Sequence, residues 1–255
     1  MDRQNLKKLW QSEEKKVLKG WDFSYLDNRW SHSPTTWDYD KIVRKFKSET
    51  DLLLDMGTGG GEYLLTLNHP YIQTFVTEGH LPNVELCKRT LSPLGITVKQ
   101  VFEDDKLDFN DEFFDIIINR HESFNIEEVS RVLKPNGLFI TQQVGRDNSI
   151  DLNSMILPEY KSLYPNQTLE NQINIVKSTS FDVLFQAEEY PITRFYDIGA
   201  IVYYAKAIEW EFPNFSVEKH FSQLCNMHRK LEQQGYIESR EHRFIIVAQK
   251  NNIQK

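Results

Sequence analysis

A short glycine-rich segment contains the residue types that point most directly to chemistry in this sequence. It reads Asp55-Met-Gly57-Thr-Gly59-Gly-Gly61-Glu62. Glycine lets the backbone turn tightly and lets a ligand approach without a clash from a Cβ atom. The segment follows an apolar run at residues 51–56 and precedes a helical pattern, which is the setting that cofactor-binding glycine loops require. A glycine turn that binds no ligand is the alternative interpretation.

Carboxylates around this loop separate two classes of cofactor. A dinucleotide site prefers the spacing Gly-x-Gly-x-x-Gly, because its pyrophosphate lies on the N-terminus of the following helix. Here Glu62 stands where the third glycine would be, and a carboxylate there opposes a pyrophosphate. Asp55 and Glu62 instead suit a cofactor with an ammonium end and a sulfonium centre. A hydride-transferring dehydrogenase therefore ranks last.

Further acids follow the next two predicted strands. Glu78 comes after residues 74–77, where its carboxylate can accept hydrogen bonds from both hydroxyls of a ribose. Glu103 and Asp104 follow residues 97–102, where an acid can accept from the amine of adenine. In open α/β sheets, ligands bind at the carboxyl ends of the strands. We therefore expect these acids and the glycine loop to form one site.

The elements that must position these residues alternate between strand and helix. Strands are predicted at residues 51–56, 74–77, 97–102, 115–118, 138–144, 183–190 and 242–249. The run Asp115-Ile-Ile-Ile118 is typical of a strand that is covered on both faces. Helices are predicted at residues 62–67, after Pro82, from Asn125 and at residues 169–177. This order predicts an α/β fold with a doubly wound, mostly parallel sheet and right-handed crossovers.

The segments outside this pattern predict additions to the sheet. Residues 6–17 have the apolar spacing of an amphipathic helix, which we expect to pack on the protein rather than on a membrane. The aromatic stretch at residues 21–39 predicts an ordered loop, followed by a short helix at residues 39–46. Residues 191–235 predict a helical insertion, whose long helix begins after Ser216 and ends before Gly235.

Composition excludes several classes of protein. Hydrophobic residues make up 40% and charged residues 26% of the 255 residues, which excludes global disorder. The net charge of −7 does not favour binding to bulk nucleic acid. The two cysteines cannot build a disulfide framework, and no second Cys/His pair completes a zinc site with Cys225-x-x-His228. Without an apolar membrane span or signal core, we expect a cytoplasmic protein with no metal.

Four ordered segments resemble the class I S-adenosylmethionine-dependent methyltransferases. They are the glycine loop, Glu78 after the second strand, Val101-Phe-Glu-Asp-Asp-Lys-Leu-Asp-Phe109 followed by Phe114-Asp115-Ile-Ile-Ile118, and Arg131-Val-Leu-Lys-Pro-Asn-Gly-Leu-Phe-Ile140. The resemblance covers about residues 39–144. Glu103 stands where many relatives have Asp, and Asn136-Gly137 where Gly-Gly is common.

This resemblance implies a Rossmann-like, seven-stranded sheet with an antiparallel last strand and a helical lid insertion. It implies a single domain over residues 1–255, with a core at about 40–190 and 236–250. Residues 1–39 would form an N-terminal cap, and residues 191–235 the lid. Aromatic side chains in these flanking segments, including Trp21, are candidates for a roof over the site, although core packing explains about half of them.

The family resemblance also implies the cofactor S-adenosyl-L-methionine and a role for each matching residue. Asp55 and the backbone of Gly57, Gly59 and Gly61 would hold the methionine portion. Glu78 would bind the ribose. Gly79 and His80 would lie along the adenine, and Glu103 with the Asp104 backbone would read its edge.

Residues at the ends of the fourth and fifth strands are the candidates for the acceptor side. Methyl transfer is an in-line displacement for which the protein supplies mainly alignment and a dry pocket. A base is needed only when the acceptor loses a proton. We predict His121 and Glu122 as catalytic residues that orient the acceptor or accept its proton. The alternatives are a local hydrogen bond for His121, and a solvated acid or an indirect cofactor contact for Glu122.

The predicted function is methyl transfer to a small-molecule acceptor. One alternative is an RNA or protein methyltransferase, although the sequence has no Asn-Pro-Pro-aromatic motif for planar amines. Another alternative is a cofactor-binding module without catalysis. The chain is expected to be a monomer or a homodimer. Neither the acceptor nor the methylated atom follows from the sequence.

Overall fold

The computed structural model of the protein describes residues 2–18, 22–103 and 106–252. The chain divides into two units, each with its own buried core. One unit, here called the sheet unit, contains residues 36–144, 167–188 and 243–255. The other, here called the helical unit, contains residues 1–35, 145–166 and 189–242. Both units are therefore assembled from segments that are far apart in the sequence.

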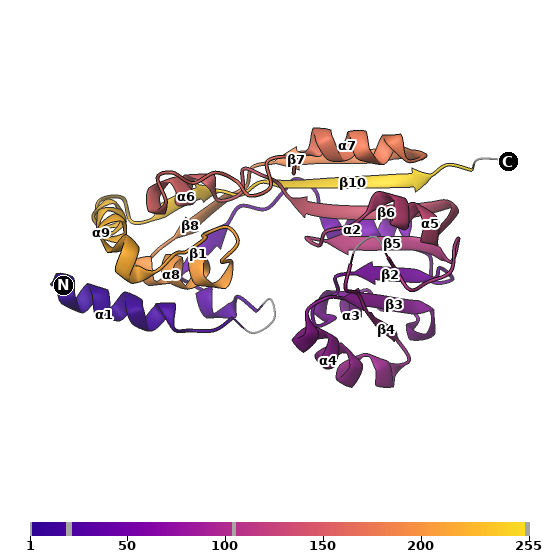
Figure 1. Cartoon of the computed structure of the whole chain (residues 1–255), viewed down its shortest axis with the longest axis horizontal. Coiled ribbons are helices and arrows are strands. Elements are labelled where there is room, and N and C mark those ends of the chain that lie inside the picture. The colour runs from indigo at the N-terminus through magenta and orange to yellow at the C-terminus, as the bar shows by residue number, and fades with distance from the viewer. Residues whose placement is uncertain (1, 19–21, 104–105, 253–255) are drawn as a thin grey trace. The chain divides into compact units, whose positions relative to one another are not determined.

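A seven-stranded sheet lies at the centre of the sheet unit (Figure 1). Its strands, in spatial order, are β4 (Thr97–Gln100), β3 (Thr74–Glu78), β2 (Leu53–Met56), β5 (Phe114–Arg120), β6 (Leu133–Val144), β10 (Arg243–Lys250) and β7 (Phe181–Glu189). Strands β4, β3, β2, β5 and β6 pair in parallel, whereas β10 pairs antiparallel with β6. The predicted fold class, including the antiparallel last strand, is confirmed.

Helices cover both faces of this sheet. One face packs on α2 (Tyr39–Phe46), α3 (Glu62–Thr66) and α4 (Leu81–Thr90), and the other on α5 (Ile126–Val132) and α7 (Leu169–Ser178). Successive side chains of a strand point to opposite faces. Ile118 accordingly packs with Val43 of α2, and Ile117 with Val129 of α5. The continuous isoleucine run of β5 is thus explained by apolar contacts on both sides.

Side-chain caps mark where α2, α5 and α7 of the sheet unit begin. The carboxylate of Asp38 accepts from the backbone N–H of Lys41 at the start of α2. The amide oxygen of Asn125 accepts from the N–H groups of Glu127 and Glu128, so the predicted start of α5 is confirmed. Such caps satisfy backbone donors that have no partner within the helix.

The predicted turn at residues 134–137 is an excursion inside β6. Leu133 pairs with Phe114 and Leu138 pairs with Ile116, so four residues of β6 lie opposite Asp115 alone. Asn136 adopts a left-handed φ of +64°, which Asn tolerates better than most residues. The pairing resumes beyond the turn, so β6 begins at Leu133 rather than at Leu138 as predicted.

Over its described residues, the helical unit combines four α-helices with a small antiparallel sheet. The helices are α1 (Arg3–Glu14), α6 (Ile150–Ile156), α8 (Ile198–Ala207) and α9 (Val217–Gln234). The strands lie in the order β1 (Trp30–His32), β8 (Ile192–Phe195) and β9 (Ile237–Arg240). As predicted, the Ser216 side chain caps α9 and Gly235 ends it with a left-handed φ of +84°. Single 3₁₀ turns occur at Ser24–Leu26 in this unit and at Tyr71–Gln73 and Ser92–Leu94 in the sheet unit.

This small sheet corrects two predictions. Residues 30–32 are a strand rather than part of an ordered loop, and β8 begins an insertion that was predicted to be wholly helical. Trp30 pairs with Phe195, and Phe195 pairs with Ile237. Each strand has only three or four residues, so local periodicity carries little signal and the pairing depends on contacts distant in sequence.

Between β4 and β5 the chain follows an irregular path. In their described part, residues 101–113 contain no helix or strand. In the described part of the chain, no helix is both long and apolar enough to cross a membrane. Over the same residues, no group of three or more His, Cys, Asp or Glu side chains is placed to hold a metal ion.

Truncating Ile118 tests the two-sided burial of β5. Ile118 is fully buried, whereas Ile72 is 84% exposed. We expect Ile118→Ala to lower the free energy of unfolding by about 2–5 kcal/mol, because it removes transfer free energy and leaves a cavity. Ile72→Ala is the matched control and should change it by less than about 0.5 kcal/mol. Urea unfolding measures both, and equal effects would contradict the packing.

Candidate functional site

The glycine loop joins the carboxyl end of β2 to α3. Gly57 and Gly61 have φ values of +69° and +86°, in the left-handed region that side chains disfavour. Gly61 is the residue that precedes α3, so the positive φ lets the chain turn directly into the helix. At Gly57 the space is also restricted, because a Cβ atom there would lie 2.4 Å from Cγ of Glu122. The loop therefore needs glycine for both its turn and its close packing.

Glu78 holds this loop from the neighbouring strand. Its side chain is 6% exposed, and its Oε2 accepts from the N–H of Gly59 at 2.8 Å. Its Oε1 accepts from the N–H of His80 at 2.8 Å. The carbonyl of Thr77 accepts from the N–H groups of Gly57 and Thr58. A carboxylate oxygen has two lone pairs, so Glu78 retains capacity to accept from a ligand hydroxyl.

Cys87 of α4 supports the other side of the Gly59 peptide, a role that sequence reasoning missed. Its buried thiol donates to the carbonyl of Gly59 at 3.1 Å. Burial, together with the charge of Glu78, raises the pKa of the Cys87 thiol to about 12. The thiol therefore stays protonated and remains a donor. Gly59 is held on both its N–H and its C=O, which fixes the middle of the loop.

A pocket of about 220 Å³ opens at the ends of β2, β3 and β5. It is lined by Met56, Gly57, Thr77, Glu78, Gly79, Val101, Phe102, Leu107, Glu122 and Ser123. The structure thus brings together four residues that the sequence predicted as site residues. Asp55, Gly59, Gly61, Glu103 and His121 are not among its described lining residues, and Asp104 lies outside the described residues.

Phe102 is a lining residue that sequence reasoning missed. Its side chain is 84% exposed although it is a large apolar residue. An exposed aromatic ring beside a polar pocket offers a flat surface on which a planar ring can stack. Its position at the end of the third predicted strand, next to Glu103, was the signal available in the sequence. Glu103 itself is exposed.

Asp55 lies below the loop in a fully buried setting. Only 5% of its surface is exposed. Burial is the main cause that raises the pKa of its carboxyl to about 7; the charge of Glu78 acts in the same direction, and Thr58 and Arg120 act in the opposite direction. Asp55 is therefore poised between its neutral and charged forms near neutral pH. A cationic group next to it would favour the carboxylate.

Glu122 and His121 occupy different positions although they are adjacent in sequence. The Glu122 side chain lies against the bare backbone of Gly57 and lines the pocket. Its carbonyl accepts from the Gln143 amide at 2.9 Å, which fixes the chain there. His121 has a left-handed φ of +65°, and its N–H donates to the carbonyl of Gln142.

A hydrogen-bonded chain sets the tautomer of His121. The indole N–H of Trp37 donates to Oε1 of Gln142 at 2.8 Å, and an indole can only donate. The amide nitrogen of Gln142 therefore faces Nε2 of His121, at 3.3 Å. In this arrangement Nε2 accepts, and the proton of the neutral imidazole lies on Nδ1. His121 thus presents a donor rather than a base at Nδ1.

A buried polar group lies behind Glu122. The carboxamide oxygen of Asn119 accepts from Thr141 at 3.0 Å and from Gln143 at 2.7 Å. Asn119 is fully buried, and its Nδ2 has no hydrogen-bond partner among the described residues. Gln143 also bonds to Thr141, so its amide joins β5, β6 and the Glu122 backbone. The side chain of Gln143 therefore stabilises the buried side of this sheet edge.

Many aromatic residues predicted to roof the site belong to the core of the helical unit. Tyr203, Phe212 and Phe215 are buried there, and Trp30 packs against the same cluster. Trp210 is 45% exposed. Trp21 lies outside the described residues. A lid at residues 191–235 and a cap at residues 1–39 stay predictions.

Substituting Gly57 tests the contact with Glu122. Gly57→Ala should lower the free energy of unfolding by the cost of a left-handed alanine, about 1–2 kcal/mol, and by the clash with Glu122 in addition. Gly95→Ala is the matched control, because Gly95 has a φ of +100° and no atom within 4 Å of an added Cβ. Equal losses in urea unfolding would show that Glu122 does not occupy this position.

Comparison with known proteins agrees with this geometry. The family model described as a methyltransferase domain matches residues 54–141, which include the glycine loop and strands β3 and β4. No curated protein sequence matches the chain.

Solved structures share the fold at low sequence identity. A candidate methyltransferase of Bacillus halodurans is 14% identical, covers 84% of this chain and 99% of its own, and has a TM-score of 0.59. The YcgJ protein of Bacillus subtilis is 17% identical over 84% of this chain and 98% of its own, with a TM-score of 0.57. The [4+2]-cyclase SpnF is 16% identical over 86% of this chain and 87% of its own, with a TM-score of 0.50. The matched model identifies a methyltransferase domain at residues 54–141, and the shared seven-stranded sheet shows that this chain has the fold of these solved structures.

Proposed function

We propose that the protein binds S-adenosyl-L-methionine in the pocket beside the glycine loop and transfers its methyl group to a small molecule. One observation carries this proposal: the pocket combines Gly57, Glu78 and Gly79 from the ends of β2 and β3 with Glu122 from beyond β5. The glycine backbone, the carboxylate proposed to bind the ribose (Glu78) and the carboxylate proposed to face the methyl acceptor (Glu122) thus lie at one edge of the sheet. In open α/β sheets this edge is where ligands bind.

The pocket residues fit such a cofactor chemically. Glu78 can accept from ribose hydroxyls, and the exposed ring of Phe102 offers a stacking surface for adenine. Asp55 and the backbone of Gly57, Gly59 and Gly61 would hold the methionine portion. Gly79 would lie along the adenine, and Glu103 and Asp104 would read its edge. These assignments rest on the family resemblance and, for Gly57, Glu78 and Gly79, on their place in the lining of the pocket.

The chain's own residues would provide alignment and proton handling. When bound, S-adenosylmethionine supplies an electrophilic methyl group, so the protein needs mainly to orient the acceptor. Glu122 lines the pocket and is the candidate to accept a proton or to hold a polar acceptor. His121 would donate a hydrogen bond through Nδ1, because Gln142 occupies Nε2. Both roles are proposals for the catalytic residues.

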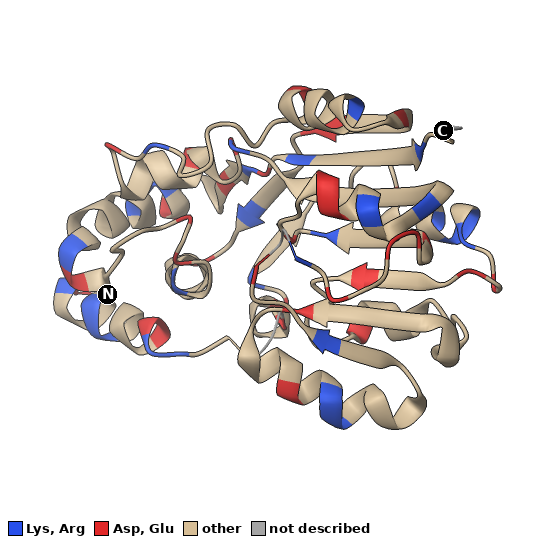
Figure 2. Ribbon diagram, turned by 45° about the vertical axis from the view of Figure 1, so that its right-hand side comes forward, with Lys and Arg blue, Asp and Glu red and all other residues tan. Residues whose placement is uncertain are grey.

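A small molecule is the favoured acceptor on grounds of charge. Lys and Arg are interspersed with Asp and Glu in each unit (Figure 2), and several cations are paired, such as Lys134 with Asp115 at 2.8 Å. An RNA methyltransferase would show binding that weakens steeply with salt. A cytoplasmic location and a monomeric or homodimeric state stay predictions.

A cofactor-binding protein without methyl transfer is the second candidate. The observation in its favour is the shared fold of SpnF, a structure described as a [4+2]-cyclase. Fold alone does not decide the reaction. Methyl incorporation into a panel of small-molecule acceptors separates the two candidates, because a binding module would retain cofactor affinity and label none of them.

Calorimetry with S-adenosylhomocysteine tests the proposed site. We expect binding by the wild-type protein and no binding of NADH. Glu78→Gln should weaken binding about tenfold or more, because it removes the charge that accepts ribose hydrogen bonds. Glu85→Gln on the exposed surface of α4 is the matched control and should bind as wild type does. Absence of binding by the wild type, or binding of NADH instead, would overturn the proposal.

The raised pKa of Asp55 predicts two opposite effects of pH. The carboxylate predominates above about pH 7, so the affinity for the cofactor's ammonium end should rise between pH 6 and pH 8. The free energy of unfolding shows the opposite dependence on pH. The unfolded Asp loses its proton near pH 4 and the folded one near pH 7, so the stability falls as pH rises through this window.

Asp55→Asn separates these effects. At pH 8 it should raise the free energy of unfolding by at most about 4 kcal/mol, the equivalent of a pKa difference between 3.8 and about 7, and near pH 4 it should change little. The same variant should bind S-adenosylhomocysteine weakly and without the pH dependence. A loss of stability at pH 8 would show that Asp55 is charged and well satisfied in the folded protein.

A further inference from the structure

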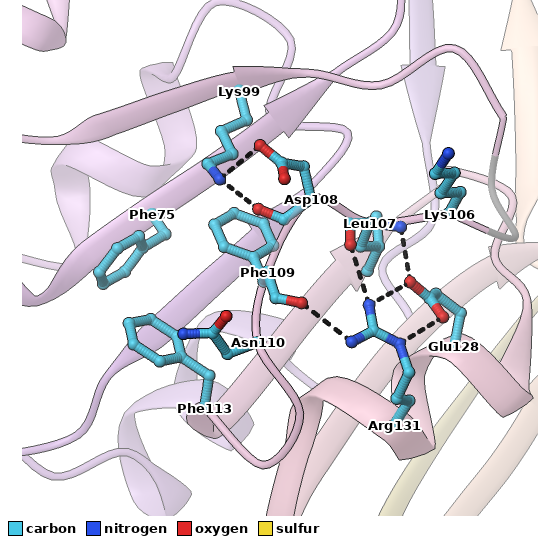
Figure 3. Close-up of a pocket in the computed structure, with 10 residues that line it drawn as sticks. All are labelled: Phe75, Lys99, Lys106, Leu107, Asp108, Phe109, Asn110, Phe113, Glu128 and Arg131. Atoms are coloured by element: carbon cyan, nitrogen blue, oxygen red, sulfur yellow. Dashed lines mark hydrogen bonds and ion pairs between the residues drawn. The ribbon is translucent and has the colours of Figure 1, made fainter.

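The irregular link between β4 and β5 borders a second hollow in the sheet unit. This hollow has a volume of about 540 Å³ and is lined by Phe75, Lys99, Lys106, Leu107, Asp108, Phe109, Asn110, Phe113, Glu128 and Arg131 (Figure 3). Leu107 lines both this hollow and the cofactor pocket. The segment around Leu107 is therefore the wall between the two.

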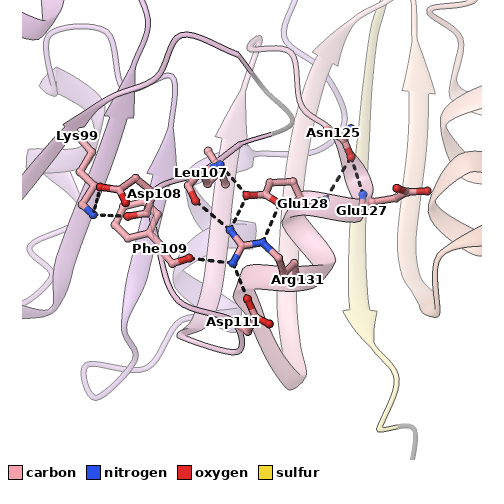
Figure 4. A network of polar contacts seen from close by, with 9 residues as sticks. All are labelled: Lys99, Leu107, Asp108, Phe109, Asp111, Asn125, Glu127, Glu128 and Arg131. Atoms are coloured by element: carbon pink, nitrogen blue, oxygen red, sulfur yellow. Dashed lines mark hydrogen bonds and ion pairs between the residues drawn. The ribbon is translucent and has the colours of Figure 1, made fainter.

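Arg131 of α5 binds this wall through its backbone. Its Nη2 donates to the carbonyl of Leu107 at 2.9 Å, and its Nη1 donates to the carbonyl of Phe109 at 2.9 Å (Figure 4). Nη1 also donates to the carboxylate of Asp111 at 2.6 Å. One guanidinium thus contacts three residues of a segment that has no helix or strand of its own.

Glu128 completes the same arrangement from one turn earlier in α5. Its Oε1 accepts from the N–H of Leu107 at 2.6 Å and from Nη2 of Arg131 at 2.5 Å. Its Oε2 accepts from Nε of Arg131 at 2.8 Å. Both backbone polar groups of Leu107 therefore bond to this ion pair. The guanidinium of Arg131 holds the pKa of Glu128 below its usual range, so the pair stays charged in mildly acidic solution.

Other contacts fix the remainder of the segment. Lys99 of β4 donates to the backbone carbonyl of Asp108, and its Nζ lies 2.7 Å from the carboxylate of the same residue. The ring of Phe109 packs edge-on against Phe114 of β5, with centroids 4.8 Å apart. The segment is thus bound to β4, β5 and α5.

The side-chain donors of Arg131 and Lys99, which line the hollow, are already used within the protein. A guanidinium has five N–H groups, and Arg131 makes five hydrogen bonds, to Leu107, Phe109, Asp111 and both oxygens of Glu128. Lys99 is bound to Asp108. These contacts indicate that Arg131 and Lys99 support the segment around Leu107 rather than bind a polar ligand.

We propose that Glu128 and Arg131 are positioning residues that hold Leu107 in place as the wall of the cofactor pocket on the adenine side. The inference rests on the proposed binding of S-adenosylmethionine. Neither side chain needs to touch the cofactor, because both act through the backbone of Leu107. Loss of the Glu128–Arg131 ion pair leaves the backbone N–H and C=O of Leu107 without these partners. Leu107 is then no longer held at a fixed distance from Phe102 and Val101, which line the same pocket.

The test compares two ligands that differ only in their base. S-Adenosylhomocysteine and its hypoxanthine analogue, S-inosylhomocysteine, share the sugar and the amino acid. We expect the wild type to prefer adenine, and Arg131→Gln to weaken adenine binding tenfold or more while bringing the two dissociation constants within about threefold. Calorimetry measures both constants, and circular dichroism confirms that each variant is folded.

Three further variants separate positioning from stability. Val129→Ala truncates a buried neighbour on α5, so it should lower the melting temperature and leave the preference between bases unchanged. The swapped pair Glu128→Arg with Arg131→Glu keeps an ion pair but cannot donate to the carbonyls of Leu107 and Phe109, so it should not restore the preference. Glu128→Gln is milder and should lower the preference even if Arg131→Gln does not fold.

The outcomes distinguish this inference from the proposed function. If the wild type binds neither ligand, the proposed function fails and the inference fails with it. If the wild type binds and discriminates, but Arg131→Gln and Glu128→Gln lose only thermal stability and keep the ratio of constants, the proposed function stands and the inference is overturned. Restoration of the ratio by the swapped pair would likewise overturn it.

Discussion

The hydrogen bonds of the Glu78 carboxylate are the interactions on which the pocket edge of the sheet depends. It is buried, and it bonds to the N–H of Gly59 in one loop and to the N–H of His80 in another. Hydrogen bonds to an ionised acceptor are stronger than those between neutral groups. One side chain at the end of β3 thereby links the glycine loop to the start of α4. The side of the pocket that Gly57, Glu78 and Gly79 line depends on this link.

Asp55 shows that this edge is not arranged for stability alone. A carboxylate with 5% exposure is costly, and its raised pKa expresses that cost. An uncharged residue would suit the buried interior of β2 better. A buried group with a perturbed pKa beside a pocket is a mark of a functional site. Under the proposed function, the cationic end of the cofactor would stabilise this charge.

Features that depend on local sequence were predictable. The apolar run of β5, the cap at Asn125 and the glycine loop each follow from neighbouring residues, and the structure contains all three. Gly57, Glu78, Gly79 and Glu122 were also predicted as site residues and line the pocket. Each lies at or just beyond the carboxyl end of a strand, where the topology of a parallel sheet brings such residues together.

Features that depend on distant contacts were not predictable. The small sheet pairs Trp30 with Phe195, and Phe195 with Ile237, and no local pattern records that pairing. The support of Leu107 by Arg131 joins side chain and backbone across 24 positions. Backbone acceptors are the same in every residue, so their partners leave no trace in the sequence. Cys87 was missed for the same reason, since its partner is the carbonyl of Gly59.

The thiol of Cys87 has a consequence for chemical reactivity. Only the thiolate attacks electrophilic reagents, and a buried thiol with a pKa of about 12 is almost never ionised at neutral pH. Alkylation of Cys87 therefore requires the Gly59 peptide to swing away and admit solvent. Cys225, which is half-buried in the helical unit, lacks that particular shield. The alkylation rates of the two thiols can therefore be compared. The slower rate, at Cys87, would report how often the glycine loop opens.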